Sequence, residues 1–474
     1  MKVLFIAAEA DPFVKVGGLA DVAGSLPLAI RSLPLDVRGS QPVDIRLIIP
    51  RHPGIEVRNA RASATLEVPH RGGTLLARVF ETRLQDIVVY LVDGQPIALS
   101  ESVYSEEAEA DADKYTFFSL AAARLGPSIG WEPDILHAND WHASLSIYAA
   151  AVEPRQSATR RPATLLTVHN LGFVGPDLTS QLEEYHLANR AAGLPRWAKA
   201  RALPLGIWGA DAIVAVSPTY AAEILTKGNG AGLEGFLRGR RARLQGILNG
   251  IDQRLYDPAT DSALGANFSL ADIGNRGRVK ANLQARLGLL EDREAPLLAI
   301  ISRLEHQKGI DLVFEALREP RIVQQRWKAV ILGVGSREFE TSAQQLQRDF
   351  PNRVRAEIRF DSELARQIYG GADLLLMPSR YEPCGLSQMI AMRYGCLPLV
   401  RATGGLRDTV VAGKTGFTFE KATSRALGNA MRTALMAFRK PEEWARMQRA
   451  AMNQDFSWDR SAALYYRLYE SLLR

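Results

Sequence analysis

Cysteine is almost absent from this sequence, which contains only Cys384 and Cys396 among its 474 residues. Two cysteines cannot build the disulfide framework that is typical of small secreted proteins. Free thiols are instead typical of a reducing compartment. The cysteine content therefore predicts a cytoplasmic protein and excludes the disulfide-rich secreted class.

Long apolar runs are also missing. No run approaches the roughly 18 consecutive apolar residues that a membrane-spanning helix requires. The N-terminus, MKVLFIAAEADPF, has a short apolar run that meets acidic residues at once, and it lacks the apolar core and cleavage site of a signal peptide. We expect no membrane segment and a cytoplasmic location.

Positive charge is present in excess but is not concentrated. The 58 Lys and Arg residues outnumber the 52 Asp and Glu residues, for a net charge of +6, and only residues 238–243 (RGRRAR) form a basic cluster. A nucleic-acid-binding protein would more often show a basic stripe with interleaved aromatic side chains. The charge therefore argues against nucleic acid and favours anionic small molecules.

Short apolar runs rich in Val, Ile and Leu recur along the whole chain. Uninterrupted runs of this kind predict parallel strands that are buried on both faces, and helical patterns lie between many of them. One such helix is predicted over residues 112–126, with Gly126 as its stop. Alternating strands and helices predict an α/β fold with doubly wound sheets. The runs are KVLFIAA, VDIRLIIP, DIVVYLVD, DILHAND, ATLLTVHN, DAIVAVS, PLLAIISRL, KAVILGVG, ADLLLMPS and LPLVRAT.

The run of strands pauses between ILNGID at 247–252 and PLLAI at 296–300, where the chain becomes polar. We place a domain boundary there and predict Rossmann-like domains over 1–250 and 251–456. Residues 457–474 predict a helix with Ser457 as its N-cap and an apolar stripe that requires a packing partner. Because ligands of open α/β sheets bind beyond the carboxyl ends of the strands, two such sheets predict an interdomain cleft.

A Gly-rich turn occurs in both halves of the chain, as KVGGLADV at 15–22 and TGGLRDTV at 403–410. Gly17 and Gly18 permit close approach of the backbone to a ligand, and a following helix offers free amides. Lys15 adds a positive charge that suits a phosphate. A tight turn with a surface lysine is an equally good interpretation of this stretch alone, because it matches neither a P-loop nor GxGxxG.

Two cations follow the strand PLLAI in the stretch ISRLEHQKG, namely Arg303 and Lys308. Together with Thr403, Gly404 and Gly405 they favour a diphosphate ligand. A departing diphosphate gains negative charge, which fixed cations stabilise more in the transition state than in the ground state.

Glu382 stands where the strand ADLLLMPS has ended and a new helix is expected. Its carboxylate could bind a sugar hydroxyl or stabilise developing positive charge. The alternative is an acid at a helix N-terminus, favoured by the helix dipole. The spacing leaves both interpretations open.

The first half contains a loose set of metal-ligand residue types, His137, Asp140 and His142. No fourth ligand stands at a recognisable spacing, so we predict no metal site. Asp140 and His169 are better candidates for binding polyhydroxyl groups, with structural hydrogen bonding as the alternative.

Two further patterns resemble known motifs but lie in the wrong context. Asp111-Ala112-Asp113 matches the DxD pattern of some glycosyltransferases, yet it opens a helix instead of ending an apolar strand. GVGS at 333–336 lacks the third glycine and the downstream acid of a dinucleotide site. We therefore interpret Asp111 and Asp113 as helix-entry residues and do not predict a dehydrogenase.

With these motifs in view, the chain closely resembles the bacterial glycogen synthases and plant starch synthases. The resemblance runs from near residue 1 to about 460, in matching order and spacing. It is carried by the segments KVGGLADV, HANDWHASL, TVHNLGF, VSPTYAAEI, ILNGID, ISRLEHQKGIDL, GGADLLLMPSRYEPCGLSQ and LPLVRATGGLRDTV.

The resemblance implies a retaining glucosyltransferase that moves glucose from ADP-glucose, or UDP-glucose in some members, to the non-reducing end of an α-1,4-glucan such as glycogen. It implies no cofactor and no metal. It also implies the two-domain GT-B fold, with the glucan acceptor on the 1–250 side, the nucleotide sugar on the 251–456 side and the C-terminal helix crossing back to the N-terminal domain. A related transferase with another sugar acceptor is the alternative.

The resemblance also assigns site residues. The catalytic set comprises Glu382, His169, Lys308 and Arg303. The acceptor side comprises Glu9, Asp21, Asp140 and Asn170. The donor-binding set comprises Lys15, Gly17, Gly18, Asn249, Cys384, Gly385, Leu386, Thr403, Gly404, Gly405 and Phe360, the last beside the adenine.

The sequence departs from the family pattern at three places. Val16 stands where most bacterial members have Thr, which removes a hydroxyl but leaves the turn. The segment at 93–105 (DGQPIALSESVYS) lacks the frequent Tyr-Asp-Arg-Pro-Gly sequence, and the segment at 195–211 also differs. Substrate contacts from the first segment and the acceptor preference do not carry over.

Overall fold

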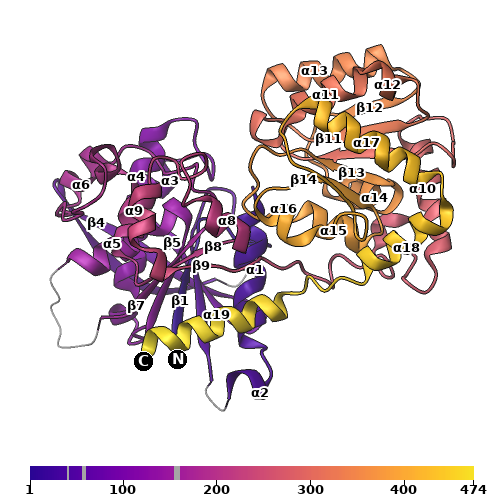
Figure 1. Cartoon of the computed structure of the whole chain (residues 1–474). Coiled ribbons are helices and arrows are strands. Elements are labelled where there is room, and N and C mark those ends of the chain that lie inside the picture. The colour runs from indigo at the N-terminus through magenta and orange to yellow at the C-terminus, as the bar shows by residue number, and fades with distance from the viewer. Residues whose placement is uncertain (40–41, 56–59, 154–160) are drawn as a thin grey trace. The chain divides into compact units, whose positions relative to one another are not determined.

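The computed structural model describes residues 1–39, 42–55, 60–153 and 161–474, which divide into two compact units. Unit 1 comprises Met1–Gly250 together with Trp458–Arg474, and unit 2 comprises Ile251–Ser457. Each unit is an α/β sandwich around one sheet, so the predicted doubly wound α/β class is confirmed (Figure 1). The described residues contain no helix long and apolar enough to cross a membrane.

Unit 1 is built on a nine-stranded sheet in the order β3-β4-β5-β2-β1-β6-β7-β8-β9. All neighbouring pairs from β5 to β9 are parallel. The strands are β1 (Lys2–Ile6), β2 (Asp44–Pro50), β3 (Arg61–His70), β4 (Gly73–Leu84), β5 (Ile87–Asp93), β6 (Ile135–Asn139), β7 (Ala163–Val168), β8 (Ala212–Ala215) and β9 (Leu244–Gly246).

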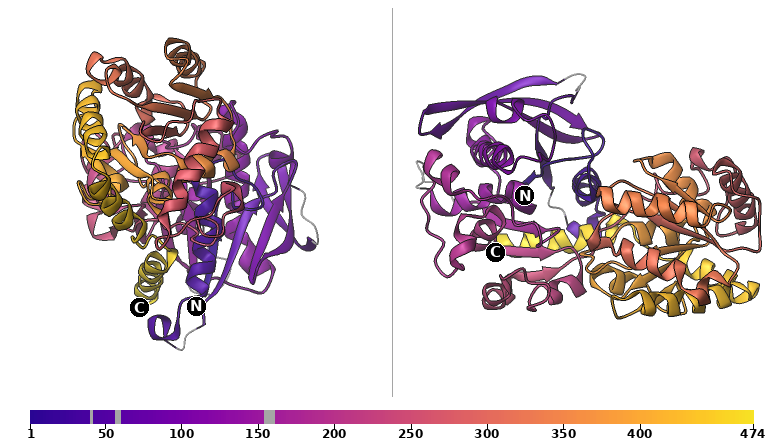
Figure 2. Two further views of the ribbon diagram at one scale, coloured as in Figure 1. Left: turned by 90° about the vertical axis from the view of Figure 1, so that its right-hand side faces the viewer. Right: turned by 90° about the horizontal axis from the view of Figure 1, so that it is seen from above.

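The antiparallel ribbon β3–β4 at one edge of this sheet was not predicted (Figure 2). Its strands alternate between exposed and buried residues instead of forming continuous apolar runs. A search for parallel strands buried on both faces therefore misses a ribbon with one face in solvent.

Helices cover both faces of the unit 1 sheet. On one face α1 packs against α19, and on the other α5 packs against α4 and α7. The helices are α1 (Gly18–Arg31), α2 (Leu35–Arg38), α3 (Gln95–Ala98), α4 (Ala108–Ser128), α5 (Asp140–Val152), α6 (Thr179–Glu184), α7 (Ala202–Gly209), α8 (Pro218–Glu223), α9 (Glu234–Gly239) and α19 (Trp458–Leu473).

Gly126 does not end its helix, as the sequence predicted, because α4 continues to Ser128. A Cβ atom on Gly126 would lie 2.6 Å from Pro133 Cδ and 2.9 Å from the carbonyl oxygen of Trp131. The glycine is therefore explained by the close approach of the returning chain to the helix, and not by helix termination.

The C-terminal helix α19 belongs to the core of unit 1. Its apolar stripe of Trp458, Ala462, Tyr465 and Tyr469 is buried with residues of α1, β1 and β2. The phenol of Tyr469 lies 2.7 Å from Nδ1 of His137, which is fully buried on β6. The chain thus returns to unit 1, where Tyr469 of its last helix contacts His137 of β6, 332 residues earlier in the sequence.

Unit 2 has a six-stranded parallel sheet in the order β12-β11-β10-β13-β14-β15. The strands are β10 (Leu297–Ile301), β11 (Lys328–Leu332), β12 (Val354–Glu357), β13 (Leu374–Met377), β14 (Leu397–Arg401) and β15 (Phe417–Phe419). The helices are α10 (Arg276–Arg286), α11 (Ile310–Arg318), α12 (Pro320–Val323), α13 (Arg337–Asp349), α14 (Ser362–Gly371), α15 (Ser387–Arg393), α16 (Gly404–Thr409), α17 (Ser424–Phe438) and α18 (Pro441–Met452).

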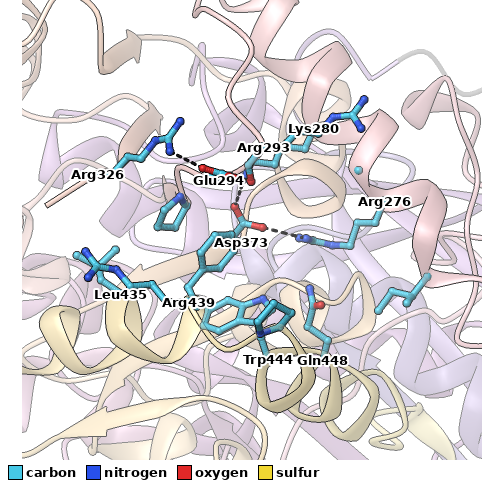
Figure 3. A pocket seen from close by; sticks show the side chains of 15 residues that line it. Arg276, Lys280, Arg293, Glu294, Arg326, Asp373, Leu435, Arg439, Trp444 and Gln448 are labelled. Atoms are coloured by element: carbon cyan, nitrogen blue, oxygen red, sulfur yellow. Dashed lines mark hydrogen bonds and ion pairs between the residues drawn. The ribbon is translucent and has the colours of Figure 1, made fainter.

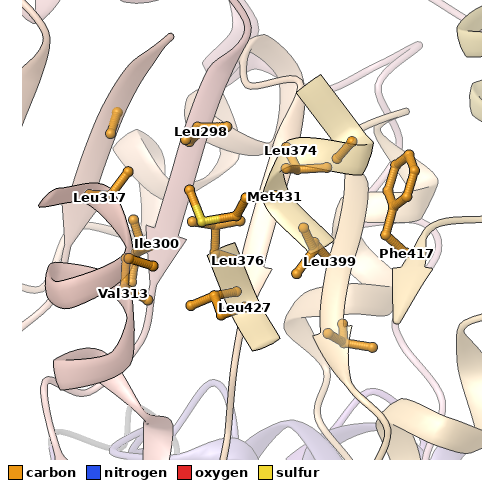
Figure 4. Packing of buried hydrophobic residues seen from close by; sticks show 14 of the residues in the cluster. Leu298, Ile300, Val313, Leu317, Leu374, Leu376, Leu399, Phe417, Leu427 and Met431 are labelled. Carbon is orange, nitrogen blue, oxygen red and sulfur yellow. The ribbon is translucent and has the colours of Figure 1, made fainter. Parts of the chain in front are cut away.

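The core of unit 2 lies between its sheet and the helices α11 and α17. Leu298 and Ile300 of β10 alternate onto this face, where they meet Val313 of α11 and Met431 of α17 (Figure 4). All four are at most 1% exposed. Because the core occupies the faces of the sheet, the polar side chains that follow the strands are left at the carboxyl edge.

Candidate active site

The loops after the strands of unit 2 meet at one edge of the sheet. Since the strands are parallel, the loops after β12, β11, β10, β13 and β14 all lie at their carboxyl ends. After β10 the chain forms β11 on one side of it, and later it forms β13 on the other side. The edge beside β10 is thus the topological switch point, where open α/β sheets bind their ligands.

Lys308 and Glu382 form an ion pair at this point. The Nζ atom of Lys308, in the short 3-10 turn His306–Lys308, lies 2.9 and 2.8 Å from the two carboxylate oxygens of Glu382. Glu382 is only 5% exposed, and the hydroxyl of Ser379 also donates to it at 2.8 Å. A carboxylate this buried requires such partners.

The interpretation of Glu382 as an acid at a helix N-terminus is wrong. The next helix, α15, begins only at Ser387, so Glu382 lies outside its first turn. The carboxylate is oriented by a lysine and a serine from neighbouring loops. The contacts with Lys308 and Ser379, and not a helix N-terminus, fix the position of the Glu382 carboxylate.

Backbone contacts hold the loops of Lys308 and Glu382 together. Gly309 has a φ of +68°, and a Cβ atom there would lie 2.4 Å from the carbonyl oxygen of Pro378. The amide of Arg380 also donates to the carbonyl of Gln307 at 2.8 Å. Glycine directly after the lysine therefore permits the close approach that the ion pair requires.

The TGG turn closes onto the Glu382 loop from β14. The amide of Gly405 donates to the carbonyl oxygen of Glu382 at 3.1 Å. A Cβ atom on Gly404 would lie 1.9 Å from that oxygen, and one on Gly405 would lie 2.1 Å from the carbonyl oxygen of Cys384. Thr403 and Cys384 are both buried. The glycine pair thus serves the packing of two loops.

Gln388 braces the turn that contains Gly385 and Leu386. Gly385 has a φ of +73°, in the left-handed region that favours glycine. The side-chain amide of Gln388 donates to the carbonyl of Gly385 at 2.9 Å and to the hydroxyl of Thr409 at 3.1 Å. Gln388 was not predicted as a site residue, because a buried glutamine has no characteristic spacing in the sequence.

Arg303 differs from Lys308 in its surroundings. Its side chain is 52% exposed, and Nη1 pairs with Glu305 at 2.9 Å. An exposed pair of this kind contributes little to stability. The guanidinium can therefore exchange Glu305 for an anionic ligand at small cost.

Phe360 and the GVGS segment occupy the far part of the same edge. Phe360 follows β12 and is 76% exposed. A Cβ atom on Gly333 would lie 1.9 Å from the carbonyl oxygen of Ser302, and one on Gly335 would lie 2.1 Å from that of Leu304. GVGS, which resembled a dinucleotide motif, thus packs beneath the loop that carries Arg303.

In unit 1 the KVGG turn is held by Glu9. The carboxylate of Glu9 accepts the amides of Val16 and Gly17 at 2.5 and 3.0 Å, and the hydroxyl of Tyr104 at 2.9 Å. Glu9 is 1% exposed, and burial raises its pKa against the opposing effect of these hydrogen bonds. The turn is therefore built on a buried carboxylate, and Gly18 begins α1 directly after it.

Lys15 forms ion pairs with two neighbouring aspartates. Its Nζ atom lies 2.5 Å from Asp21 and 3.3 Å from Asp11. Asp11 precedes α1 and Asp21 lies in the first turn of α1, so the lysine joins the connection to the helix. A phosphate at this turn would have to compete with two carboxylates for the lysine.

A second unit 1 cluster joins the ends of β6 and β7. Asp140, at a φ of +55°, accepts the amide of His169 at 2.7 Å and that of Asn170 at 3.3 Å. Burial raises the pKa of Asp140 to about 7, and the neighbouring carboxylate of Glu9 acts in the same direction. The structure therefore brings Asp140, His169 and Asn170 together, and of these the Asp140 carboxyl changes its charge near neutral pH.

Asn139 orients the His169 ring. Its side-chain amide donates to the carbonyl of Ile6 at 3.1 Å, which leaves its oxygen facing Nε2 of His169 at 3.0 Å. A neutral His169 then carries its proton on Nε2 and presents Nδ1 as an acceptor. Burial lowers the pKa of His169 to about 3, so the ring is neutral at physiological pH.

The two histidines of the HANDWH motif, His137 and His142, contact other side chains of unit 1. His137 is bonded to Tyr469 and Thr167, and His142 packs against the rings of Trp141 and Tyr115. In the part of the chain that the structure describes, no three His, Cys, Asp or Glu side chains gather in a metal-binding group. The two histidines are structural.

The DxD-like pair also has structural roles. Asp111 lies in the first turn of α4, where it pairs with the fully buried Lys114 at 2.7 Å and accepts the amide of Ser105 at 3.1 Å. Asp113 accepts the phenol of Tyr185. The helix-entry interpretation is correct in position for Asp111, which is buried, while Asp113 lies beyond the first turn of α4.

Asn249 follows β9 near the end of unit 1. It is 5% exposed, and among the described residues its side-chain oxygen has no hydrogen-bond donor.

Four residues that contact a selected residue or its turn were not predicted from the sequence. They are Tyr104, Asn139, Ser379 and Gln388. Asn139 and Ser379 had a signal, since each stands at the end of a predicted apolar strand.

Comparison with known proteins identifies the class of the molecule. Residues 2–239 match the family described as the starch synthase catalytic domain, and residues 284–451 match glycosyl transferases group 1. The glycogen synthase of Lactiplantibacillus plantarum is 39% identical over 490 residues, covering 100% of both chains. That of Thermotoga maritima is 39% identical over 496 residues, covering 100% of this chain and 99% of its own.

Solved structures agree with these relatives. The catalytic domain of starch synthase IV from Arabidopsis thaliana, bound to ADP and acarbose, is 30% identical with a TM-score of 0.87, covering 99% of each chain. A sucrose-phosphate synthase from Thermosynechococcus elongatus is 18% identical with a TM-score of 0.63, covering 99% of this chain and 98% of its own, and shows the shared fold alone.

The two parallel-sheet units, with polar residues gathered beyond their strands, define a glycosyltransferase with the GT-B fold. Within that class the chain belongs to the glycogen synthase and starch synthase family, and it is a glucosyltransferase.

Proposed function

We propose that this enzyme transfers glucose from ADP-glucose to the non-reducing end of an α-1,4-glucan, with retention of the anomeric configuration. The relatives named glycogen synthase and the likeness to a starch synthase bound to ADP and acarbose support this reaction. The single observation that carries it is the buried Lys308–Glu382 pair at the switch point of the unit 2 sheet.

Unit 2 supplies the donor side. Arg303 and Lys308 bind the diphosphate, which gains charge as its bond to glucose breaks. Gly404 and Gly405 let the backbone come close to the same phosphates. Phe360, exposed after β12, lies towards the adenine. Thr403, Cys384, Gly385 and Leu386 complete the donor set.

Unit 1 supplies the acceptor side and part of the donor site. Glu9, Asp21, Asp140 and Asn170 are assigned to the glucan. Lys15, Gly17, Gly18 and Asn249 are assigned to the donor. His169, held neutral by burial and oriented by Asn139, presents one acceptor nitrogen to a sugar hydroxyl.

The transfer proceeds on one face of the sugar. The bond from C1 to the diphosphate oxygen breaks while C1 bonds to the attacking O4 of the glucan. The proton of that hydroxyl passes to the departing phosphate oxygen. Glu382 stabilises the positive charge that develops on the sugar, and the two cations stabilise the departing phosphate.

The test is a matched set of incubations with purified protein, glycogen and either ADP-glucose or UDP-glucose. We expect stoichiometric ADP release and glucan growth, with UDP-glucose slower. An α-specific amylase should digest the added glucose units, which would show that the new linkages have the α configuration. Growth from UDP-glucose alone would overturn the donor assignment, and nucleotide release without glucan growth would overturn the acceptor assignment.

A further inference from the structure

Unit 2 contains a pocket at the edge of its sheet opposite to the Lys308–Glu382 pair. Its volume is about 750 Å³, which is in the usual range for small-molecule sites. Pro296, Arg326 and Asp373 line it and stand directly before or within two residues of β10, β11 and β13. The other walls come from α10 on one side and from α17 and α18 on the other (Figure 3).

Positive charge predominates in this pocket. Five cationic side chains line it, against two carboxylates, those of Asp373 and Glu294. The cations are Arg276, Lys280, Arg293, Arg326 and Arg439. A site with this balance attracts anions.

The carboxylates are already engaged. Asp373, 5% exposed, pairs with Arg276 at 3.4 Å and Lys280 at 2.7 Å and accepts the amide of Leu297 at 2.8 Å. Glu294 pairs with Arg326 at 2.6 Å. Asp292, outside the pocket lining, also pairs with Arg326 at 2.8 Å, so three carboxylates balance the three inner cations. Arg293 and Arg439 are left to determine the charge of the pocket.

Arg293 and Arg439 are held only weakly. Arg293 is 75% exposed on its side chain and pairs at 3.1 Å with Glu291, itself 56% exposed, an arrangement worth little in water. Arg439 donates to the amide oxygen of Gln325 at 2.8 Å, and no ion pair to it occurs within the described residues. Both guanidinium groups can therefore turn to a ligand.

The pocket also contains a buried donor without an acceptor. Trp444 is 6% exposed, and among the described residues its indole N–H has no hydrogen-bond partner. Its ring meets Phe438 edge-on at 5.1 Å, and Nζ of Lys280 lies 5.2 Å from the Phe438 ring centre. A buried N–H without an acceptor is unfavourable, and a ligand acceptor beside it relieves this cost.

We propose that this pocket binds a small phosphate-bearing molecule, of sugar-phosphate or mononucleotide size, at a site separate from the catalytic edge. Arg293 and Arg439 bind the phosphate, because a planar guanidinium matches its oxygens. The Trp444 indole donates to a second acceptor of the ligand, and the aromatic rings face its sugar or base. The proposal is independent of the donor and acceptor assigned above.

The experiment follows the indole N–H signals of the seven tryptophans by ¹⁵N NMR, with Trp444→Phe used to assign one of them. The protein carries Arg303→Ala and Lys308→Ala, so that phosphate binding at the catalytic edge is weakened. Glucose 1-phosphate, AMP and inorganic phosphate are the probes, and glucose is the neutral control. We expect the phosphate-bearing organic probes to move the Trp444 signal saturably, and glucose to leave it in place.

Matched charge variants test the phosphate contacts. Arg293→Gln with Arg439→Gln should weaken the response of the Trp444 signal at least tenfold. Arg348→Gln, which removes the same charge from α13 away from the pocket, should leave it unchanged. Circular dichroism verifies folding, and hydrogen exchange of residues 435–448 gives a second readout that does not depend on Trp444.

Three results would overturn the proposal. One is an unchanged Trp444 signal together with unchanged exchange at 435–448 for every probe. Another is an equal response to glucose and to glucose 1-phosphate. The third is an undiminished response in the Arg293 and Arg439 double variant. The glycogen extension assay is not part of this test, so a failure here leaves the proposed function in place.

Discussion

Lys308 and Glu382, 74 residues apart in the sequence, form a two-oxygen ion pair at 2.8 and 2.9 Å. The pair spans two strands of one sheet and is mostly shielded from water, with side-chain exposures of 19% and 6%. Removing one partner of a shielded pair leaves an uncompensated charge, so activity and stability must be measured together. The ammonium group of Lys308 has three N–H donors, so it can bind a phosphate while it keeps its ion pair with Glu382.

Lys308→Ala should slow transfer by roughly 10²–10³-fold, because about 2–4 kcal/mol of charge stabilisation in the transition state is lost. Initial rates with ADP-glucose and glycogen measure this loss. Lys421→Ala removes an exposed lysine from the same unit and should leave the rate unchanged. A near-normal rate from folded Lys308→Ala protein would exclude Lys308 from phosphate stabilisation.

Glu382→Gln should nearly abolish transfer while nucleotide binding remains measurable. The amide keeps the shape of the side chain and the contact with Ser379 but removes the negative charge beside the sugar. Calorimetric titration with ADP and a turnover assay on the same sample separate the two effects. Unchanged turnover would remove Glu382 from the site, and lost ADP binding would indicate a structural role.

Gly405→Ala should disrupt the packing of the TGG turn against the Glu382 loop. The added Cβ atom would lie 2.1 Å from the carbonyl oxygen of Cys384, so one of the two backbones must move. We expect a fall in melting temperature and a loss of activity beyond tenfold. Gly235→Ala places a Cβ atom in open space on α9 and should not destabilise the protein. Equal behaviour of the two variants would contradict this account of the turn.

Unit 1 should be less stable in mild acid than unit 2. Burial lowers the pKa of His52 to about 4 and that of His169 to about 3, and it holds the pKa of His137 and His142 well below the usual value. Below about pH 6.5 the histidines of the unfolded chain are protonated, while those of the folded unit stay neutral. The free energy of unfolding of unit 1 therefore falls as the pH is lowered from about 6.5 towards 4. The carboxyls of Asp140 and Glu9 oppose this effect, because burial raises the pKa of both and the folded unit then binds their protons before the unfolded chain does.

The expected loss for unit 1 between pH 6.5 and 5 is on the order of 3 kcal/mol, since each unbalanced proton changes stability by about 1.4 kcal/mol per pH unit. Hydrogen exchange resolved by peptide measures the two units separately. His52→Gln keeps the donor to the carbonyl of Ala8 and should reduce the loss by about 1 kcal/mol. His306→Gln makes the same chemical change in unit 2 and should leave the acid sensitivity of unit 1 unaltered.

The strand endings predicted which residues would gather at one edge of the unit 2 sheet. Lys308, Glu382 and Thr403 were selected because each follows an apolar run, and the structure places all three at one edge of the unit 2 sheet. Parallel pairing makes this inference sound, because it aligns the carboxyl ends of the strands. The β3–β4 ribbon was not predicted, because its strands alternate in polarity. The prediction for Gly126 was wrong, because this glycine is explained by a contact with residues 131–133.

The sequence by itself determined the α/β class, the residues that end the strands and the Gly-rich turns, because local hydrophobic runs and glycine positions are written directly along the chain. Only the tertiary structure decided what those residues contact. It paired Glu382 with Lys308, placed the buried Glu9 carboxylate under the amides of Val16 and Gly17, and set Asn139 against His169. Such pairings depend on strand order and on the burial of charge, and neither is encoded in local spacing.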